Sequence, residues 1–273
     1  IEVSSRLYTE NGAAYATALV MSKTDTDAPV VSPVTFILSD KRLITVRYED
    51  PRAFTVFPTR AAKSPIGGDA PDLALVGLLE ALIERMADLS ERITRDIDRV
   101  SRDIFKAQGA GPSRRRDFHG ILIDLGRKGE FASQIRDSLV TLSRAVGFLI
   151  LYADQREKEG RDRKTDKDFR ARLKSVARDA GSLTDHASFV ADKITFLLDA
   201  TLGMVNIEQN QIIKIFSIAA VAFLPPTLIA SVYGMNFEHM PELASRAAYP
   251  IVIGAMILSA VIPLAYFKRR GWW

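Results

Sequence analysis

The sequence contains no cysteine and only three histidines. Without cysteine the chain cannot form disulfides or a thiolate metal site. His119, His186 and His239 are isolated, and none has a second ligand at metal-binding spacing. We therefore expect structural or surface roles for them. The sequence also shows no nucleophile–base pair and no cluster of metal ligands. An enzymatic function is therefore not expected, even for a catalytic domain attached to a membrane, and no organic cofactor is expected.

The excess of positive charge is small, at +4, although the pI is about 9.3. The arginines alternate with acidic residues along predicted helices, a pattern typical of solvated helix faces, so no nucleic-acid partner is expected. The chain opens at Ile1 rather than at a methionine, and no signal-peptide pattern follows. This indicates a trimmed N-terminus.

Two long runs almost lack charge. Residues 212–233 contain only Lys214, and residues 249–267 contain no charged residue. About 20 apolar residues in a helix cross a bilayer. We therefore predict a transmembrane domain over 212–273, with spans at 212–233 and 249–267, a loop at 234–248 and a basic tail at 268–273.

The charges that flank the spans predict their orientation. Lys268, Arg269 and Arg270 follow the second span, and the positive-inside rule places that end in the cytoplasm. With two spans, the large N-terminal part is then cytoplasmic as well. Glu238 and Glu242 lie in the loop, where their field would attract cations to the outer side.

Residues 1–70 read as a sheet-containing α/β part. Val34–Leu38 and Leu43–Tyr48 are β-branched runs around a turn at Ser39–Lys41. Ala14–Val20 and Phe54–Phe57 are further strand candidates. A sheet that supports helices is the expected role of this part.

Helical periodicity begins after a linker at 64–68. Apolar residues recur at spacings of three and four from Pro71 to Lys106, and again from about Arg115 to Lys158. These two helices form the predicted region 71–164. A third helix, capped by Thr165, has no proline before Pro225 and forms a stalk over 165–211 that continues into the first span.

The end of the first span carries a recognisable motif, Tyr233-Gly234-Met235-Asn236, which precedes a short acidic loop and the second span. Together with Asn210, the Leu224–Thr227 turn and Tyr249-Pro250, it resembles the CorA magnesium transporter family. The resemblance implies an α+β cytoplasmic domain with long helices, two transmembrane helices and a funnel-shaped homopentamer in the bacterial inner membrane. It implies that Gly234, Met235 and Asn236 form the selectivity filter.

A sevenfold repeat leads back from Gly234 along the third helix. It keeps one face of the helix turned toward a supercoil axis. Along the chain, the side chains on this face are first acidic, then small or amide-bearing, and finally apolar or hydroxyl-bearing. An ordinary coiled coil would carry Leu and Ile at these positions. Its members are Asp185, Phe189, Asp192, Phe196, Asp199, Gly203, Asn206, Asn210, Ile213, Ser217, Ala220, Leu224, Thr227, Ser231 and Gly234.

Polar groups inside a membrane avoid lipid, so this face should meet water or other copies of the chain. One copy cannot enclose a path, which predicts a symmetric ring. Mg²⁺ keeps its water shell and prefers oxygen, so Asn236, Asn210 and Thr227 would contact the hydrated ion. The stretch from Ile213 to Leu224 would gate by dewetting, and Asp199 would receive the ion.

The resemblance also implies that the pore closes when intracellular Mg²⁺ occupies acidic sites between cytoplasmic domains. Asp88, Asp96, Asp179 and Asp185 are the candidates here, although no motif selects among them. The resemblance places the basic end, Lys268 to Arg270, around the cytoplasmic pore neck.

Two alternatives remain open. One is a transporter of zinc, cobalt or nickel in the same superfamily, although Met235 and Glu238 favour magnesium. The other is a membrane-anchored coiled-coil scaffold without transport, against which the small and polar residues of the repeat argue.

Overall fold

The computed structural model describes residues 6–26, 28–63, 70–106, 117–158, 163–236, 240–241, 245 and 247–272. It divides into two compact units, Ile1–Thr201 and Leu202–Trp273. The boundary between the units falls within the predicted stalk, and helix α4 (Arg163–Tyr233) contributes residues to both. Each unit is described by itself.

The first unit contains a four-stranded antiparallel sheet in the order β1 (Leu7–Glu10), β2 (Ala13–Ser22), β3 (Val30–Leu38) and β4 (Leu43–Arg47). The strands predicted at 14–20, 34–38 and 43–48 are confirmed. Strand β1 was not expected, because it is short and mostly exposed. Asn11 and Gly12 both have positive φ, of 51° and 75°, and form the two-residue turn that pairs β1 with β2.

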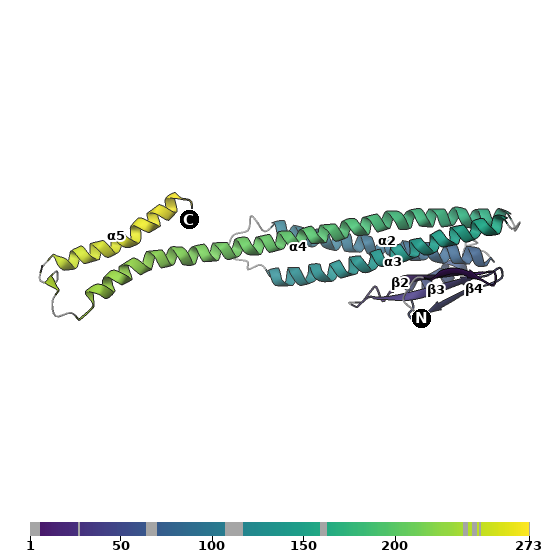
Figure 1. The fold of residues 1–273 in the computed structure, drawn as a ribbon, viewed down its shortest axis with the longest axis horizontal. Helices are drawn as coiled ribbons and strands as arrows, with labels where there is room; N and C mark the ends of the chain where they lie inside the picture. Colours follow the sequence, from purple (N-terminus) through teal and green to yellow (C-terminus); the bar gives the residue numbers. More distant parts are fainter. Residues whose placement is uncertain are drawn as a thin grey trace. The chain divides into compact units, whose positions relative to one another are not determined.

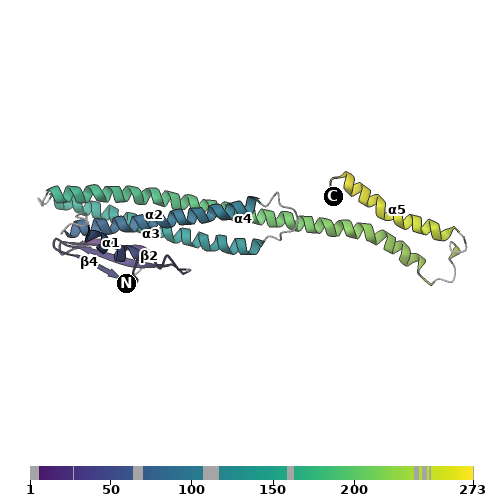
Figure 2. The ribbon, with the colours of Figure 1, turned by 180° about the vertical axis from the view of Figure 1, so that it is seen from behind.

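The strand predicted at Phe54–Phe57 is wrong, because these residues belong to helix α1 (Arg52–Ala61). Phe54 stacks on Phe36 of β3, with ring centroids 6.4 Å apart. Phe57 lies against Gly77 of the next helix, where an added Cβ would approach its ring to 2.6 Å. Three residues apart, the two rings share a helix face and join the sheet to that helix. Figure 2 shows α1 beside α2 and the sheet. Four residues are too few to reveal this periodicity in the sequence.

Three long helices form the rest of this unit: α2 (Pro71–Lys106), α3 (Phe118–Lys158) and the first part of α4 (Figure 1). The bounds predicted for α2 are confirmed, and its regularly spaced apolar residues are buried. The N-cap predicted at Thr165 is wrong, because α4 begins two residues earlier. The predicted linker and the start proposed for α3 at Arg115 lie outside the described residues.

Ion pairs give the directions of these helices. Arg172 and Lys193 of α4 pair with Glu80 and Asp98 of α2, so the two helices run in the same direction. Lys128 of α3 approaches Asp96, whereas Arg156 pairs with Asp72, so α3 runs the opposite way to α2.

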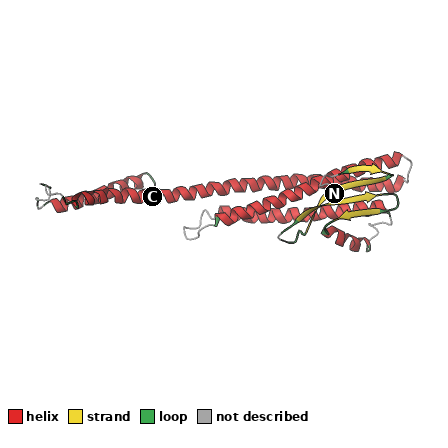
Figure 3. Cartoon of the chain, turned by 60° about the horizontal axis from the view of Figure 1, so that its bottom comes forward, coloured by secondary structure: helices red, strands yellow, loops and turns green. Residues whose placement is uncertain are grey.

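The sheet lies against the long helices of this unit (Figure 3), and helix α3 packs on strand β2. The Thr141 hydroxyl accepts a hydrogen bond from the Leu19 backbone N–H at 2.9 Å, and the Tyr152 hydroxyl donates to the Gly12 carbonyl at 2.9 Å. Strand β2 is consequently buried at almost every position. The sheet therefore supports the helices, as the sequence predicted.

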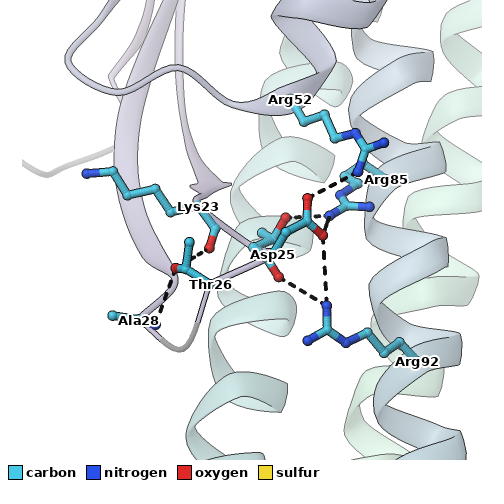
Figure 4. A network of polar contacts seen from close by, with 8 residues as sticks. Lys23, Asp25, Thr26, Ala28, Arg52, Arg85 and Arg92 are labelled. Carbon is cyan, nitrogen blue, oxygen red and sulfur yellow. Dashed lines mark hydrogen bonds and ion pairs between the residues drawn. The ribbon is translucent and has the colours of Figure 1, made fainter.

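The loop after β2 is tied to α1 and α2 by arginines (Figure 4). Asp25 accepts hydrogen bonds from Arg85 at 2.8 Å and from Arg52 at 3.1 Å. Arg92 lies 3.9 Å from the same carboxylate and donates to the Thr24 carbonyl at 3.2 Å. The hydrogen bond from Arg85 is the main reason that the pKa of Asp25 lies below its ordinary value, and the charges of Arg85 and Arg52 act in the same direction.

The second unit consists of the C-terminal part of α4 and helix α5 (Ala248–Arg269). Both helices are long and apolar enough to cross a membrane. The turn expected at Leu224–Thr227 is wrong, because α4 continues through Pro225 and Pro226. Two prolines remove two N–H donors from the helix, which accounts for the bend near its C-terminal end (Figure 1).

Candidate ion pathway along helix α4

One side of α4 is exposed along most of its length. Every member of the sevenfold repeat from Asp185 to Gly234 is exposed in the single chain. Large apolar residues are included, with Phe189 and Ile213 each 61% exposed and Leu224 66% exposed. Exposed phenylalanine, isoleucine and leucine at regular spacing on one face are typical of a surface that meets another chain.

The first unit packs against the other side of the same helix. Val190, Ile194 and Leu197 are buried there, while Asp192, Phe196 and Asp199 point outward. Asp185, Asp192 and Asp199 form no ion pair with any described residue. The packing of α4 against α2 and α3 therefore leaves these three carboxylates exposed. Another copy of the chain could approach them from this side.

In the second unit the covered side is narrower, because Ala222 is the one buried residue among those described there. Ala222 is 9% exposed and shares a groove with Leu264 of α5. Successive helical residues are about 100° apart, so Ala220 and Leu224, two residues on either side, point to the opposite side of the helix. Asn206, Asn210, Ser217 and Thr227 are exposed with them. Helix α5 therefore leaves the predicted pore-lining residues uncovered.

Thr227 has a defined orientation. Its hydroxyl donates a hydrogen bond to the Phe223 carbonyl at 2.7 Å. The proton is thus engaged within the helix, and the lone pairs of the hydroxyl oxygen remain available to accept. A hydrated cation presents hydrogen atoms outward, so an acceptor is the appropriate partner.

The helix ends at the predicted filter. The Gly234 N–H donates to the Ala230 carbonyl at 2.9 Å, and the Met235 N–H donates to the Val232 carbonyl at 3.4 Å. A Cβ at position 234 would lie 3.0 Å from the Ala230 oxygen. Gly234 does not have a positive φ, so space beside this carbonyl explains the glycine. Asn236 follows and is exposed; Glu238, Glu242 and His239 lie outside the described residues.

The four candidate regulatory acids are divided between α2 and α4. Among the residues that the structure describes, no group of three acidic or histidine side chains could hold a metal ion. Asp96 lies 3.8 Å from both Arg99 and Lys128. Asp88 and Asp179 lie on α2 and α4, and Asp185 belongs to the exposed repeat.

Asp98 is a nearby carboxylate that is already engaged. Lys193 donates a hydrogen bond to it, and this contact lowers the pKa of Asp98. Asp96 and Asp98 lie on different flanks of α2, toward Lys128 of α3 and Lys193 of α4, and only the packing of the three helices shows which cation each one meets.

The basic end has one contact that the sequence reading missed. Lys268 and Arg269 lie in the last turn of α5, and Arg270 follows them. Trp272 stacks on Phe267, with centroids 5.1 Å apart, and the Lys214 Nζ lies 5.5 Å from the Trp272 ring centroid. The feature of the sequence that could have indicated this contact is Lys214, because it is the single charged residue of the first apolar run.

Comparisons with known proteins find relatives along almost the whole chain. Residues 5–269 match the family model described as CorA-like Mg²⁺ transporter protein. The chain is 34% identical over its whole length to the magnesium transport protein CorA of Mannheimia succiniciproducens and covers 81% of it. It is 35% identical to the protein of the same name from Escherichia coli K12, at the same coverage.

A solved structure supports the fold. The complete CorA magnesium transporter from Methanocaldococcus jannaschii matches with a TM-score of 0.77 over 98% of this chain and 80% of that chain. The sequence identity there is 18%, so this likeness concerns the fold.

Proposed function

Because this chain belongs to the family of CorA-like Mg²⁺ transporters, whose members are ion transporters and not enzymes, we propose that it forms a homopentameric pore for passive Mg²⁺ influx. Both termini would lie in the cytoplasm and the two apolar helices would cross the inner membrane. The observation that carries the proposal is that every member of the sevenfold repeat from Asn206 to Ser231 is exposed on α4, as are Gly234 and Asn236 after the helix ends.

In this proposal the exposed faces of five copies surround a central axis. The filter would be a ring of Asn236 amides beside the turn at Gly234 and Met235. Their carbonyl oxygens accept hydrogen bonds from the water shell of Mg²⁺, which the ion gives up reluctantly. Glu238 and Glu242 would raise the local concentration of cations at the outer mouth.

Deeper in the pore, the Thr227 ring would repeat the contact with the water shell. The engagement of its proton by Phe223 at 2.7 Å supports this role, because each hydroxyl then presents lone pairs only. Ile213, Ser217, Ala220 and Leu224 would form the mostly apolar section that closes by losing water. On the cytoplasmic side of this apolar section, Asn210 and Asn206 would accept hydrogen bonds from the water shell of the ion. Asp199 would receive the ion at the cytoplasmic end.

We propose that intracellular Mg²⁺ regulates the pore by binding between neighbouring copies. Asp185 is the candidate with the clearest support, because it belongs to the sevenfold repeat, is exposed and has no ion pair with any described residue. Asp88, Asp96 and Asp179 remain candidates for the neighbouring surface. Lys268, Arg269 and Arg270 would surround the cytoplasmic neck and favour closure by repelling cations.

Uptake into proteoliposomes tests the proposal. Mg²⁺ entry should be strong in the unchanged protein and abolished in Asn236→Ala, with oligomer assembly retained. Gln134→Ala is the matched control, because it removes a carboxamide from α3, remote from the pore residues in sequence, and should transport normally. Normal uptake by Asn236→Ala would refute the filter role.

The same vesicles separate the alternatives. Co²⁺, Ni²⁺ and Zn²⁺ are measured beside Mg²⁺, and hexaamminecobalt serves as a mimic of the hydrated ion. Block by this mimic is expected if the intact shell is recognised. Preferred Zn²⁺ entry would favour a zinc transporter, and no entry of any cation would favour a scaffold.

A further inference from the structure

A groove within the second unit is not used by the ion pathway. It lies between α4 and α5, on the side of α4 opposite the exposed repeat, and has a volume of about 550 Å³. One end carries polar groups, from Gln211, Lys214 and Trp272. The rest is apolar and includes Ile218, Ala222 and Leu264.

Lys214 is the unusual member of this groove. Its ammonium group lies over the Trp272 ring but forms no ion pair with a described residue. Among the described residues of the second unit, four are cationic (Lys214, Lys268, Arg269 and Arg270), and only Glu208 is acidic. A cation beside an apolar groove in a membrane-crossing unit requires an anion or water. Because positive side chains outnumber negative ones in this unit, we expect the partner of Lys214 to be an anion from outside the chain.

The shape of the groove is amphipathic as well. Gln211 and Phe223 mark its two ends along α4, and twelve residues of helix span about 18 Å. Positive charge lies at one end only, next to the basic residues that end α5. Trp272 lies at that end, and tryptophan concentrates at the level of lipid headgroups. An inorganic anion would occupy the charged end but would leave the apolar length unfilled.

We propose that this groove binds an anionic phospholipid, with its phosphate at Lys214 and an acyl chain along Ile218, Ala222 and Leu264. Basic pockets between transmembrane helices on the cytoplasmic side are suited to such headgroups. The lipid would fill the outer side of the α4–α5 pair while the exposed repeat faces the pore. This inference rests on the membrane placement in the proposed function but not on transport.

The two tryptophans of the chain, Trp272 and Trp273, provide the measurement. The full protein is reconstituted in phosphatidylcholine vesicles, and acyl-brominated phosphatidylglycerol or acyl-brominated phosphatidylcholine is added in equal series. Bromine quenches nearby tryptophan, so the ratio of the two apparent affinities measures preference for the anionic headgroup. Phosphatidylglycerol should be preferred, and Lys214→Gln should reduce the preference about fivefold.

Two matched variants test whether the groove is responsible. Lys174→Gln removes the same charge from an exposed position of α4 in the first unit and should leave the preference unchanged. Arg269→Gln removes a positive charge from the basic end, outside the groove lining, and should reduce the preference less than Lys214→Gln does. Equal losses in Lys214→Gln and Arg269→Gln would overturn the proposal in favour of diffuse attraction.

The remaining outcomes separate this inference from the proposed function. Equal quenching by both lipids in the unchanged protein would overturn the lipid site and leave the pore proposal intact. Absence of quenching by either lipid would contradict the membrane placement of the basic end, on which both depend. Displacement of phosphatidylglycerol by millimolar inorganic phosphate would overturn the lipid assignment, because a free anion would then suffice.

Discussion

Arg156 of α3 donates two hydrogen bonds to Asp72 of α2, with Nη1–Oδ1 and Nη2–Oδ2 distances of 2.9 Å and 3.2 Å. Both residues are less than a tenth exposed. The guanidinium carbon also lies 5.5 Å from the ring centroid of Tyr152, whose hydroxyl binds the Gly12 carbonyl. This buried pair therefore joins the beginning of α2, the end of α3 and the first turn of the sheet.

The buried pair predicts a large loss of stability when one partner is neutralised. Asp72→Asn leaves Arg156 buried with a weaker partner, and removal of one member of such a pair costs about 3 kcal/mol or more. Asp103→Asn, at an exposed position of the same helix, should change stability by less than about 0.5 kcal/mol. The apparent melting temperature of the purified protein is the measurement, and equal shifts for the two variants would contradict the expectation.

The contacts of Asp25 predict a pH-dependent contribution to stability. Arg85 and Arg52 hold its pKa below the ordinary value of about 3.9, so the folded state favours the carboxylate. That stabilisation is present above about pH 4 and is lost as the pH falls through the lower, folded-state pKa. Asp25 is 57% exposed, so solvent limits the effect to about 1 kcal/mol.

The measurement is the difference in melting temperature between the unchanged protein and Asp25→Asn. We expect a positive difference at pH 7 that shrinks as the pH falls below about 4. Asp103→Asn serves again as the reference. A difference that stays constant over this range would show that the carboxylate charge does not contribute.

The end of α4 predicts unequal effects of two glycine substitutions. Gly234→Ala places a methyl group 3.0 Å from the Ala230 carbonyl, so the turn before Asn236 must shift. Gly181→Ala adds the same methyl group in open space on the same helix and should stabilise it by about 0.5–1 kcal/mol. Mg²⁺ uptake should fall at least tenfold in the first variant and remain normal in the second, and equal uptake would argue against a tight turn.

The Thr227 hydroxyl predicts a specific requirement for its oxygen. Thr227→Val preserves the shape of the side chain and should lower Mg²⁺ uptake several-fold, whereas Thr227→Ser should restore most of it. Thr94→Val is the control, because Thr94 of α2 also donates to the carbonyl four residues earlier at 2.7 Å. If Thr227→Val transports as well as Thr94→Val, the hydroxyl contributes only to the helix.

Removal of internal Mg²⁺ should open the pore. In the proposed gating, Mg²⁺ between copies neutralises facing acidic residues, and its loss lets them repel each other. Currents in patches should therefore increase several-fold when a chelator replaces internal Mg²⁺. Asp185→Asn should weaken this response, while Asp103→Asn should preserve it. Equal currents with and without internal Mg²⁺ would contradict the gating proposal.

Much of the architecture could be predicted from local patterns. The apolar residues of α2 recur over ten turns, so the helix from Pro71 to Lys106 was predicted with its correct bounds. Strand β3 alternates buried and half-buried residues, which its β-branched run indicated. Phe54–Phe57 was wrongly predicted as a strand because one short apolar cluster fits either period. Its helical state depends on contacts with Phe36 and Gly77, which are distant in the sequence.

The sequence by itself determined that the chain has two charge-poor spans, a motif between them and a sevenfold repeat leading to that motif, because each of these is a matter of spacing and composition. Only the tertiary structure decided which charges are engaged. Asp72, Asp25 and Asp98 are paired with cations from other helices, whereas Asp185 and Asp199 are exposed without such partners among the described residues. A charge acquires its role from groups that folding brings within a few ångströms, and those distances are not encoded in local periodicity.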